Sequence, residues 1–180
     1  ASKFWPVIEQ HSVTHISLLP FVIQTAFEQG IPEDHTVRIG VFGLIMPVLD
    51  QMMGMRVVAA YGMTELVTHC IHSNPFEQYP ELAMGKVSPG YEFLIVKEDG
   101  GLAEVGEMGE LWIRGVRGVS VCLEYFGNDE ANEKFFTDDG WARTGDIVRL
   151  LEDGNIKYCD RDKDALKVGG ENVSAREVED

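Results

Sequence analysis

The stretch "YGMTE" brings together side-chain types that could bind a nucleotide. Tyr61 and Gly62 end an apolar run, "RVVAA", and Thr64 and Glu65 follow shortly after. An aromatic ring offers a face to a flat base, glycine lets a backbone approach closely, a hydroxyl bonds a phosphate oxygen, and a carboxylate holds Mg²⁺. We predict a site for a base, a phosphate and a cation; the alternative is a turn in which Thr64 caps a helix.

A second candidate is Asp146 in "GWARTGD", which follows Gly145 and precedes the apolar pair "IV". Because a carboxylate has two oxygens that accept hydrogen bonds, this side chain can bind both hydroxyls of a ribose. The pattern therefore predicts a sugar-binding carboxylate. The alternative is an ordinary turn Asp before a strand.

The C-terminal segment "DRDKDALKVGGENV" is densely charged and contains a glycine pair. Five charged residues in a row, 160–164, are unsuited to a core and indicate a solvated joint between domains. Behind them Lys167 precedes Gly169 and Gly170, an arrangement that packing alone explains less readily. A polar loop without a role is the alternative.

The elements that position these residues are predicted from apolar spacing. In the first half we expect short helices at 3–11 and 20–29, strands at 37–43 and 56–62, and a helix between the two strands. Strand, helix, strand indicates a parallel α/β unit. Its ligand crevice lies at the carboxyl ends of the strands, which is where "YGMTE" falls.

The second half has the pattern of an antiparallel sheet or small barrel. The runs "YEFLIVKEDG", "GELWIRG" and "GWARTGDIVRLLEDGNIKYCDR" read as short strands joined by turns, with a short helix in "GNDEANEKFF". We read "GELWIRG" as mainly structural and expect Gly109 and Gly115 to shape turns.

Composition excludes several classes of partner. With 180 residues and a formal net charge of −15, the chain lacks the cationic surface that nucleic acids need, although local donors can still bind ATP or coenzyme A. Its three cysteines form no CxxC motif, which suits the cytoplasm. The run "HCIH" lacks the further ligands of a closed zinc site, and no apolar run is long enough to span a membrane.

Four stretches, "YGMTE", "GELWIRG", "GWARTGD" and "DRDKDALKVGGENVSAREVE", occur in an order and spacing that resemble the adenylate-forming superfamily. This superfamily includes acyl-CoA synthetases, 4-coumarate–CoA ligases, firefly luciferase and the adenylation domains of peptide synthetases. The forms "YGMTE" and "GGENV" look most like acyl-CoA ligases. The resemblance covers nearly the whole chain.

The resemblance implies an α/β plus β fold, made of the C-terminal part of the large domain and the start of the small C-terminal domain. The expected segments are a partial α/β subdomain at 1–84, a β-rich, barrel-like subdomain at 85–159, a hinge at 160–164 and the beginning of the cap domain at 165–180.

The resemblance also implies a role for each residue of the nucleotide site. Tyr61 would lie near adenine, Thr64 at the α-phosphate and Glu65 on Mg²⁺. Asp146 would bind the ribose, and Arg161 the ribose or a phosphate.

Four further residues are implied for the later step, in which the acyl group passes to coenzyme A. Lys163 occupies the hinge position about which the small domain rotates. Lys167, Gly169 and Gly170 match the loop that is brought to the active site, where the glycines let a pantetheine arm pass.

The implied activity is an ATP-dependent, AMP-forming acid–thiol ligase that activates a carboxylic acid as acyl-adenylate and passes it to coenzyme A. ATP or AMP, Mg²⁺ and coenzyme A are the cofactors, and a homo-oligomer remains open. The family's triphosphate loop, near "SGSTGxPKG", and its C-terminal catalytic Lys are absent. Since the chain also starts without Met and ends where the capping box of Ser174 and Glu177 begins a helix, we expect a fragment that is inactive alone.

Three alternatives stay open. The chain could be a non-catalytic fragment that binds a nucleotide or a partner. It could belong to another branch of the superfamily, a luciferase or an amino-acid adenylation domain. A generic α/β nucleotide-binding domain, such as a dehydrogenase, is disfavoured because no GxGxxG follows a strand.

Overall fold

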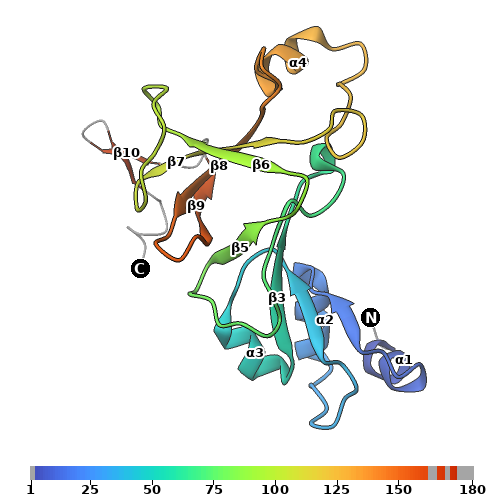
Figure 1. Ribbon diagram of the computed structural model, residues 1–180. Helices are drawn as coiled ribbons and strands as arrows, with labels where there is room; N and C mark the ends of the chain where they lie inside the picture. Colours follow the sequence, from blue (N-terminus) through green and yellow to red (C-terminus); the bar gives the residue numbers. More distant parts are fainter. Residues whose placement is uncertain (1–2, 162–165, 169–170, 174–180) are drawn as a thin grey trace.

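The computed structural model describes residues 3–161, 166–168 and 171–173, with side chains up to residue 160. Figure 1 shows two halves: a lower one with helices beside parallel strands, and an upper one of antiparallel strands with one labelled helix, α4. In chain order the elements are α1 (Phe4–Gln10), β1 (His15–Ser17), α2 (Pro20–Glu28), β2 (Ile39–Phe42), α3 (Pro47–Met53), β3 (Arg56–Tyr61), the 3₁₀ helix η1 (Thr64–Leu66), β4 (Ile71–His72), β5 (Ala83–Val87), β6 (Glu92–Val96), β7 (Met108–Arg114), α4 (Asp129–Phe135), β8 (Ala142–Leu150), β9 (Ile156–Arg161), β10 (Leu166–Val168) and β11 (Glu171–Val173).

The first half is the predicted parallel α/β unit. Strands β1, β2 and β3 pair in parallel and in sequence order. Helices α2 and α3 each begin with proline, at Pro20 and Pro47, where its fixed φ suits the first turn. Helix α3 ends at Gly54, whose φ of +62° is the left-handed conformation typical of a helix C-terminus. The helix–strand core contains the buried Leu18, Met53 and Val57.

The second half is antiparallel, as predicted. Strands β9, β8, β7 and β6 lie side by side in that order, and β4 and β5 join them to β3, so that one nine-stranded sheet runs through both halves. The predicted boundary after residue 84 falls inside β5, and the division into domains stays a prediction. The two-stranded sheet of β10 and β11 follows.

The expectation that Gly109 shapes a turn is wrong. It lies inside β7, opposite Val148 of β8. A Cβ at this position would stand 2.7 Å from the carbonyl oxygen of Val96 on the neighbouring strand. A close approach of two strands therefore requires the glycine. Gly115 comes directly after β7, where a Cβ would crowd the Ser120 hydroxyl.

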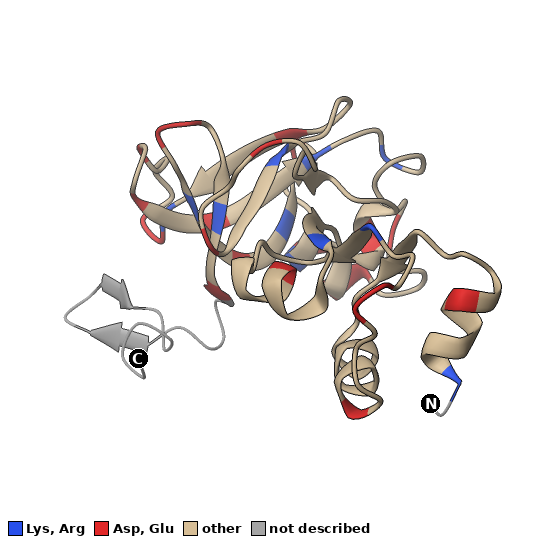
Figure 2. Ribbon diagram, turned by 90° about the horizontal axis from the view of Figure 1, so that it is seen from below, with Lys and Arg blue, Asp and Glu red and all other residues tan. Residues whose placement is uncertain are grey.

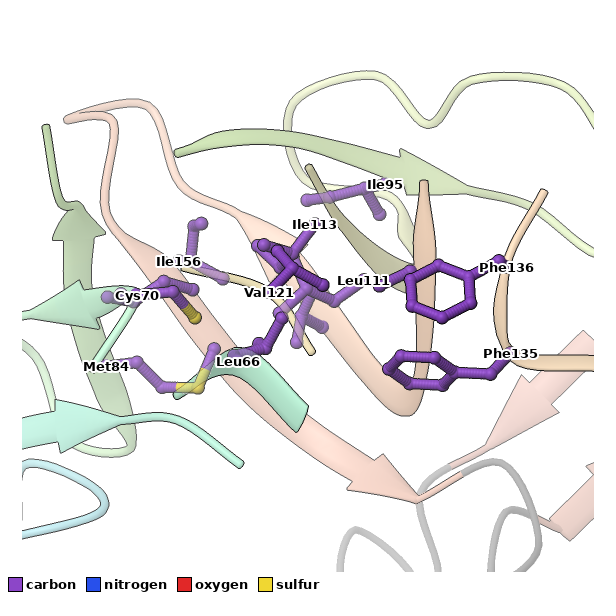
Figure 3. Close-up of a cluster of buried hydrophobic side chains, with 13 residues drawn as sticks. Leu66, Cys70, Met84, Ile95, Leu111, Ile113, Val121, Phe135, Phe136 and Ile156 are labelled. Atoms are coloured by element: carbon purple, nitrogen blue, oxygen red, sulfur yellow. The ribbon is translucent and has the colours of Figure 1, made fainter. Parts of the chain in front are cut away.

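The largest hydrophobic cluster joins the two halves. It combines side chains that follow β3 with side chains of the antiparallel strands, and Figure 3 shows Leu66 beside Leu111 and Val121. Leu66 is fully buried. Because burying a leucine contributes about 1.5–3 kcal/mol, this contact anchors the short helix η1 against the β-rich half.

Acidic residues lie mainly on helices and loops, whereas several basic residues lie on the strands of the sheet (Figure 2). Acidic residues outnumber basic ones by 30 to 15, which gives the net charge of −15. Among the described residues, no helix combines the length and apolar character needed to cross a bilayer.

Candidate functional site

Tyr61 and Asp146 meet across the two halves of the molecule. The Tyr61 hydroxyl, at the end of β3, donates to Oδ2 of Asp146 on β8 at 2.5 Å, although the residues are 85 apart in sequence. Asp146 is only 4% exposed. Burial of the phenol and, next, the charge of Asp146 raise the pKa of Tyr61 well above its usual range. Tyr61 therefore stays protonated and remains a donor to the carboxylate.

A bulge in β8 aims the Asp146 side chain. The pairing of β7 with β8 shifts register here, and Gly145 has a φ of +70°, a conformation that favours glycine. Thr144 braces the bulge, since its hydroxyl donates to the carbonyl of Leu111 at 2.7 Å and accepts from the amide of Asp146 at 3.2 Å. The glycine and threonine of "TGD" thus set the direction of the acid.

Glu110 braces the same bulge from β7. Its Oε1 accepts from the amide of Gly145 at 2.9 Å, and its Oε2 accepts from the Trp112 indole at 2.8 Å. Sequence reasoning assigned no role to Glu110. The available signal was strand alternation, which places Glu110 and Trp112 on one face of β7.

Arg161 comes to the same place through strand pairing. In the register of β8 with β9, Asp146 and Arg161 are direct partners. The structure thus brings together Tyr61, Asp146 and Arg161, which the sequence separates widely. Their roles toward a nucleotide stay predictions.

The turn after β3 holds the remaining residues of "YGMTE". Gly62 is required there, since a Cβ would stand 2.7 Å from the carbonyl oxygen of Thr68. Thr64 is exposed and is the first residue of η1. The residue in the cap position is Met63, and η1 has no side-chain cap. The alternative in which Thr64 caps a helix is therefore not what the structure contains.

Glu65 is held by the β-rich half. The Tyr125 hydroxyl donates to Oε1 of Glu65 at 2.6 Å across 60 residues, and the amide of Cys122 donates to the carbonyl of Glu65 at 2.6 Å. Burial and the hydrogen bond to Glu65 raise the pKa of Tyr125 above its usual range. Sequence reasoning missed Tyr125, because nothing in "LEYFG" distinguishes its ring from ordinary packing.

The chemistry of Glu65 fits one kind of metal site. Its second oxygen, Oε2, accepts no hydrogen bond from the described residues. Within the part of the chain that the structure describes, no three His, Cys, Asp or Glu side chains gather into a metal cluster. Mg²⁺ is commonly bound by one or two carboxylates together with water and substrate phosphates. Glu65 fits such a shared site, and an all-protein cage does not fit.

The other predicted residues lie near the C-terminus. Lys167 is in β10, where it pairs with Asn172 of β11. Lys163, Gly169 and Gly170 lie outside the described residues, as does most of the predicted hinge at 160–164. Their roles stay predictions.

Comparison with known proteins gives consistent results. A family model described as AMP-binding enzyme matches residues 1–126. The chain is 31% identical to a crotonobetaine/carnitine–CoA ligase of Escherichia coli (strain ATCC 8739) and 32% identical to that of Salmonella typhimurium (strain LT2). Each alignment covers 99% of this chain and 36% of the relative, so the chain spans about a third of the length of the curated relatives it matches.

Solved structures share the fold. The o-succinylbenzoate–CoA synthetase of Bacillus subtilis, in complex with ATP and magnesium, matches with a TM-score of 0.79 at 30% identity, over 97% of this chain and 37% of that one. An anthranilate–CoA ligase in complex with anthranoyl-AMP matches with a TM-score of 0.82 at 25% identity, over 99% of this chain and 35% of that one.

Proposed function

This chain belongs to the family of AMP-binding enzymes, and from that membership we propose that it serves in an ATP-dependent, AMP-forming acid–thiol ligase. The ligase joins a carboxylic acid to coenzyme A through an acyl-adenylate. The proposal is supported by the relatives, which are CoA ligases, and by similar structures that hold ATP or an acyl-AMP.

The contact between Tyr61 and Asp146 carries the proposal. The carboxylate is buried and held by a protonated phenol at 2.5 Å, and its residue pairs with Arg161 in the next strand. A carboxylate so fixed accepts hydrogen bonds from the two hydroxyls of a ribose. We assign Asp146 to the ribose, Arg161 to the ribose or a phosphate, and the Tyr61 and Gly62 end of β3 to the base.

In the first half-reaction, an oxygen of the substrate carboxylate attacks the α-phosphorus of ATP, and the bond from that phosphorus to pyrophosphate breaks. Thr64 bonds an oxygen of the α-phosphate. Glu65 would hold Mg²⁺, which would neutralise phosphate charge. The contribution of these residues is positioning and electrostatic stabilisation.

In the second half-reaction, the thiol of coenzyme A attacks the acyl carbonyl carbon, the bond from that carbon to AMP breaks, and the thiol proton passes to solvent. We assign the hinge to Lys163 and the passage of the pantetheine arm to Lys167, Gly169 and Gly170. These four assignments rest on the sequence motif.

The test is ATP–pyrophosphate exchange by the full-length protein with a panel of carboxylic acids. We expect exchange that depends on one class of acid, and release of AMP when coenzyme A is added. A preference for a carrier protein over coenzyme A would point to an adenylation domain. If none of the acids supported exchange and no thiol released AMP, the proposal would be overturned.

A further inference from the structure

We propose that Tyr125 is a positioning residue that presents the Glu65 carboxylate to a divalent cation. It would do so by holding Oε1 and leaving Oε2 without a hydrogen-bond partner among the described residues. The inference rests on the proposed function and adds to it a residue outside the four sequence motifs.

The position of the Tyr125 hydroxyl is set by α4. The amide of Tyr125 donates to Oδ1 of Asn132 at 2.7 Å, and Nδ2 of Asn132 donates back to the carbonyl of Tyr125 at 3.0 Å. The ring packs edge-to-face on Phe135, with centroids 5.6 Å apart and planes at 74°. Backbone and ring are thus both fixed by contacts that do not involve Glu65.

The backbone of Glu65 is fixed separately. Its carbonyl accepts from the amide of Cys122 at 2.6 Å, and the next carbonyl, that of Leu66, accepts from the Tyr91 hydroxyl at 2.8 Å. With Leu66 fully buried, the freedom left at Glu65 is the rotation of its side chain. The hydrogen bond from Tyr125 removes that freedom, which is how a metal ligand is oriented by a neighbouring group.

The type of partner matters as much as its position. A Lys or Arg in place of Tyr125 would neutralise the carboxylate, whereas a phenol orients it and leaves the negative charge for a cation. Within the described part of the chain, no basic side chain forms an ion pair with Glu65. Glu65 as a residue is half-buried rather than enclosed, and a magnesium shell is completed by water and phosphate oxygens.

The test is Tyr125→Phe in the full-length protein, since phenylalanine keeps the ring on Phe135 and the backbone bonds to Asn132. ATP binding is followed by calorimetry over a range of Mg²⁺ concentrations, and Mn²⁺ binding in the presence of ATP is followed by electron paramagnetic resonance. We expect the half-saturating concentration of either metal to rise about 10-fold, as for the loss of other groups that orient metal ligands.

The matched control is Tyr91→Phe. It also removes a hydroxyl that contacts the η1 turn, through the carbonyl of Leu66. The same hydroxyl contacts the carbonyl of Ser120 in the loop after β7, but Tyr91 does not contact the carboxylate of Glu65. We expect it to lower stability and to shift the half-saturating metal concentration by less than Tyr125→Phe does, because the amide of Cys122 still holds the carbonyl of Glu65. Glu65→Gln should lose the metal dependence of ATP binding.

The outcomes separate this inference from the proposed function. A wild-type protein that binds ATP equally well with and without metal would overturn both. If wild type requires metal but Tyr125→Phe shows the same half-saturation, or if Tyr91→Phe shifts it equally, only the role of Tyr125 is overturned. Thermal unfolding of each variant verifies that it folds.

Discussion

The two carboxylates of the candidate site, Asp146 and Glu65, are held in the same way but exposed to different extents. Each accepts a hydrogen bond from a tyrosine of the opposite half: Tyr61 of the α/β half reaches Asp146, and Tyr125 of the β-rich half reaches Glu65. Asp146 is 4% exposed and lies on a braced strand. Glu65 is half-buried and lies on a single 3₁₀ turn.

This difference separates two kinds of task. A buried carboxylate must have its hydrogen bonds satisfied by fixed donors, since unpaired burial of a charge is costly, and so it suits recognition of a ligand of fixed shape. A half-exposed carboxylate keeps access to water and ions, and so it suits a cation that shares its shell with a substrate. The reciprocal tyrosines also bind the two halves together.

The largest effect is expected for Asp146→Ala. ATP affinity of the full-length protein should fall ~100-fold, because hydrogen bonds to a charged group contribute ~1.5–3 kcal/mol each. The free energy of unfolding should fall by ~1–3 kcal/mol, because the buried Tyr61 hydroxyl loses its acceptor. Calorimetric titration and urea unfolding measure the two effects.

Asp146→Asn is the matched control, since it keeps an acceptor for Tyr61 and loses the charge. It should recover most of the stability and little of the affinity. Wild-type affinity in Asp146→Ala would remove Asp146 from the nucleotide site and, with it, the contrast with Glu65.

An intermediate effect is expected from alkaline pH through Tyr61. Its pKa in the folded protein is raised above the ordinary value of 10.0, so above that pH the unfolded chain releases a proton that the folded protein keeps. This contribution to stability is complete below pH 10 and is lost as pH rises further, at up to about 1.4 kcal/mol per pH unit.

Comparison of Tyr61→Phe with the wild type isolates the contribution of Tyr61 to stability, because the other groups titrate alike in both proteins. Urea unfolding from pH 8 to pH 11 should give a difference in stability that is constant up to about pH 10 and then shrinks. A difference in stability that stays constant to pH 11 would show that Tyr61 ionises normally. The site of Tyr61 and Asp146 would then be no more enclosed than that of Glu65.

The smallest effect is expected for Gly145→Ala. Apart from its two chain neighbours, no described residue has an atom within 4 Å of an added Cβ, and φ is +70°, so we expect a strained backbone at a cost of about 1 kcal/mol. Because the bulge aims Asp146, ATP affinity should also fall several-fold.

Gly140→Ala provides the comparison, since Gly140 has a φ of +88° and equally open surroundings but does not adjoin Asp146. Its free energy of unfolding should fall by the same amount as that of Gly145→Ala, while its affinity for ATP should stay at the wild-type value. Equal losses of affinity in the two variants would mean that the bulge does not direct the carboxylate.

Local patterns in the sequence were sufficient for most of the elements. Proline at the starts of α2 and α3 and glycine at the end of α3 bound those helices, because each residue restricts or permits a particular φ whatever surrounds it. In β7, alternate residues are buried, as the two-residue period of a strand requires. The same reasoning failed at Gly109, where the neighbouring strand sets the need for glycine.

The sequence by itself thus determined most of the elements, the parallel and antiparallel halves, and the choice of Tyr61, Asp146 and Arg161 as residues of one site. Only the tertiary structure decided how they meet and added Glu110 and Tyr125. A hydrogen bond depends on atomic positions within a fraction of an ångström, and a shift of one residue in strand register would turn Asp146 to the other face. Such positions follow from the order of the strands and the bulge in β8, to which residues throughout both halves contribute at once.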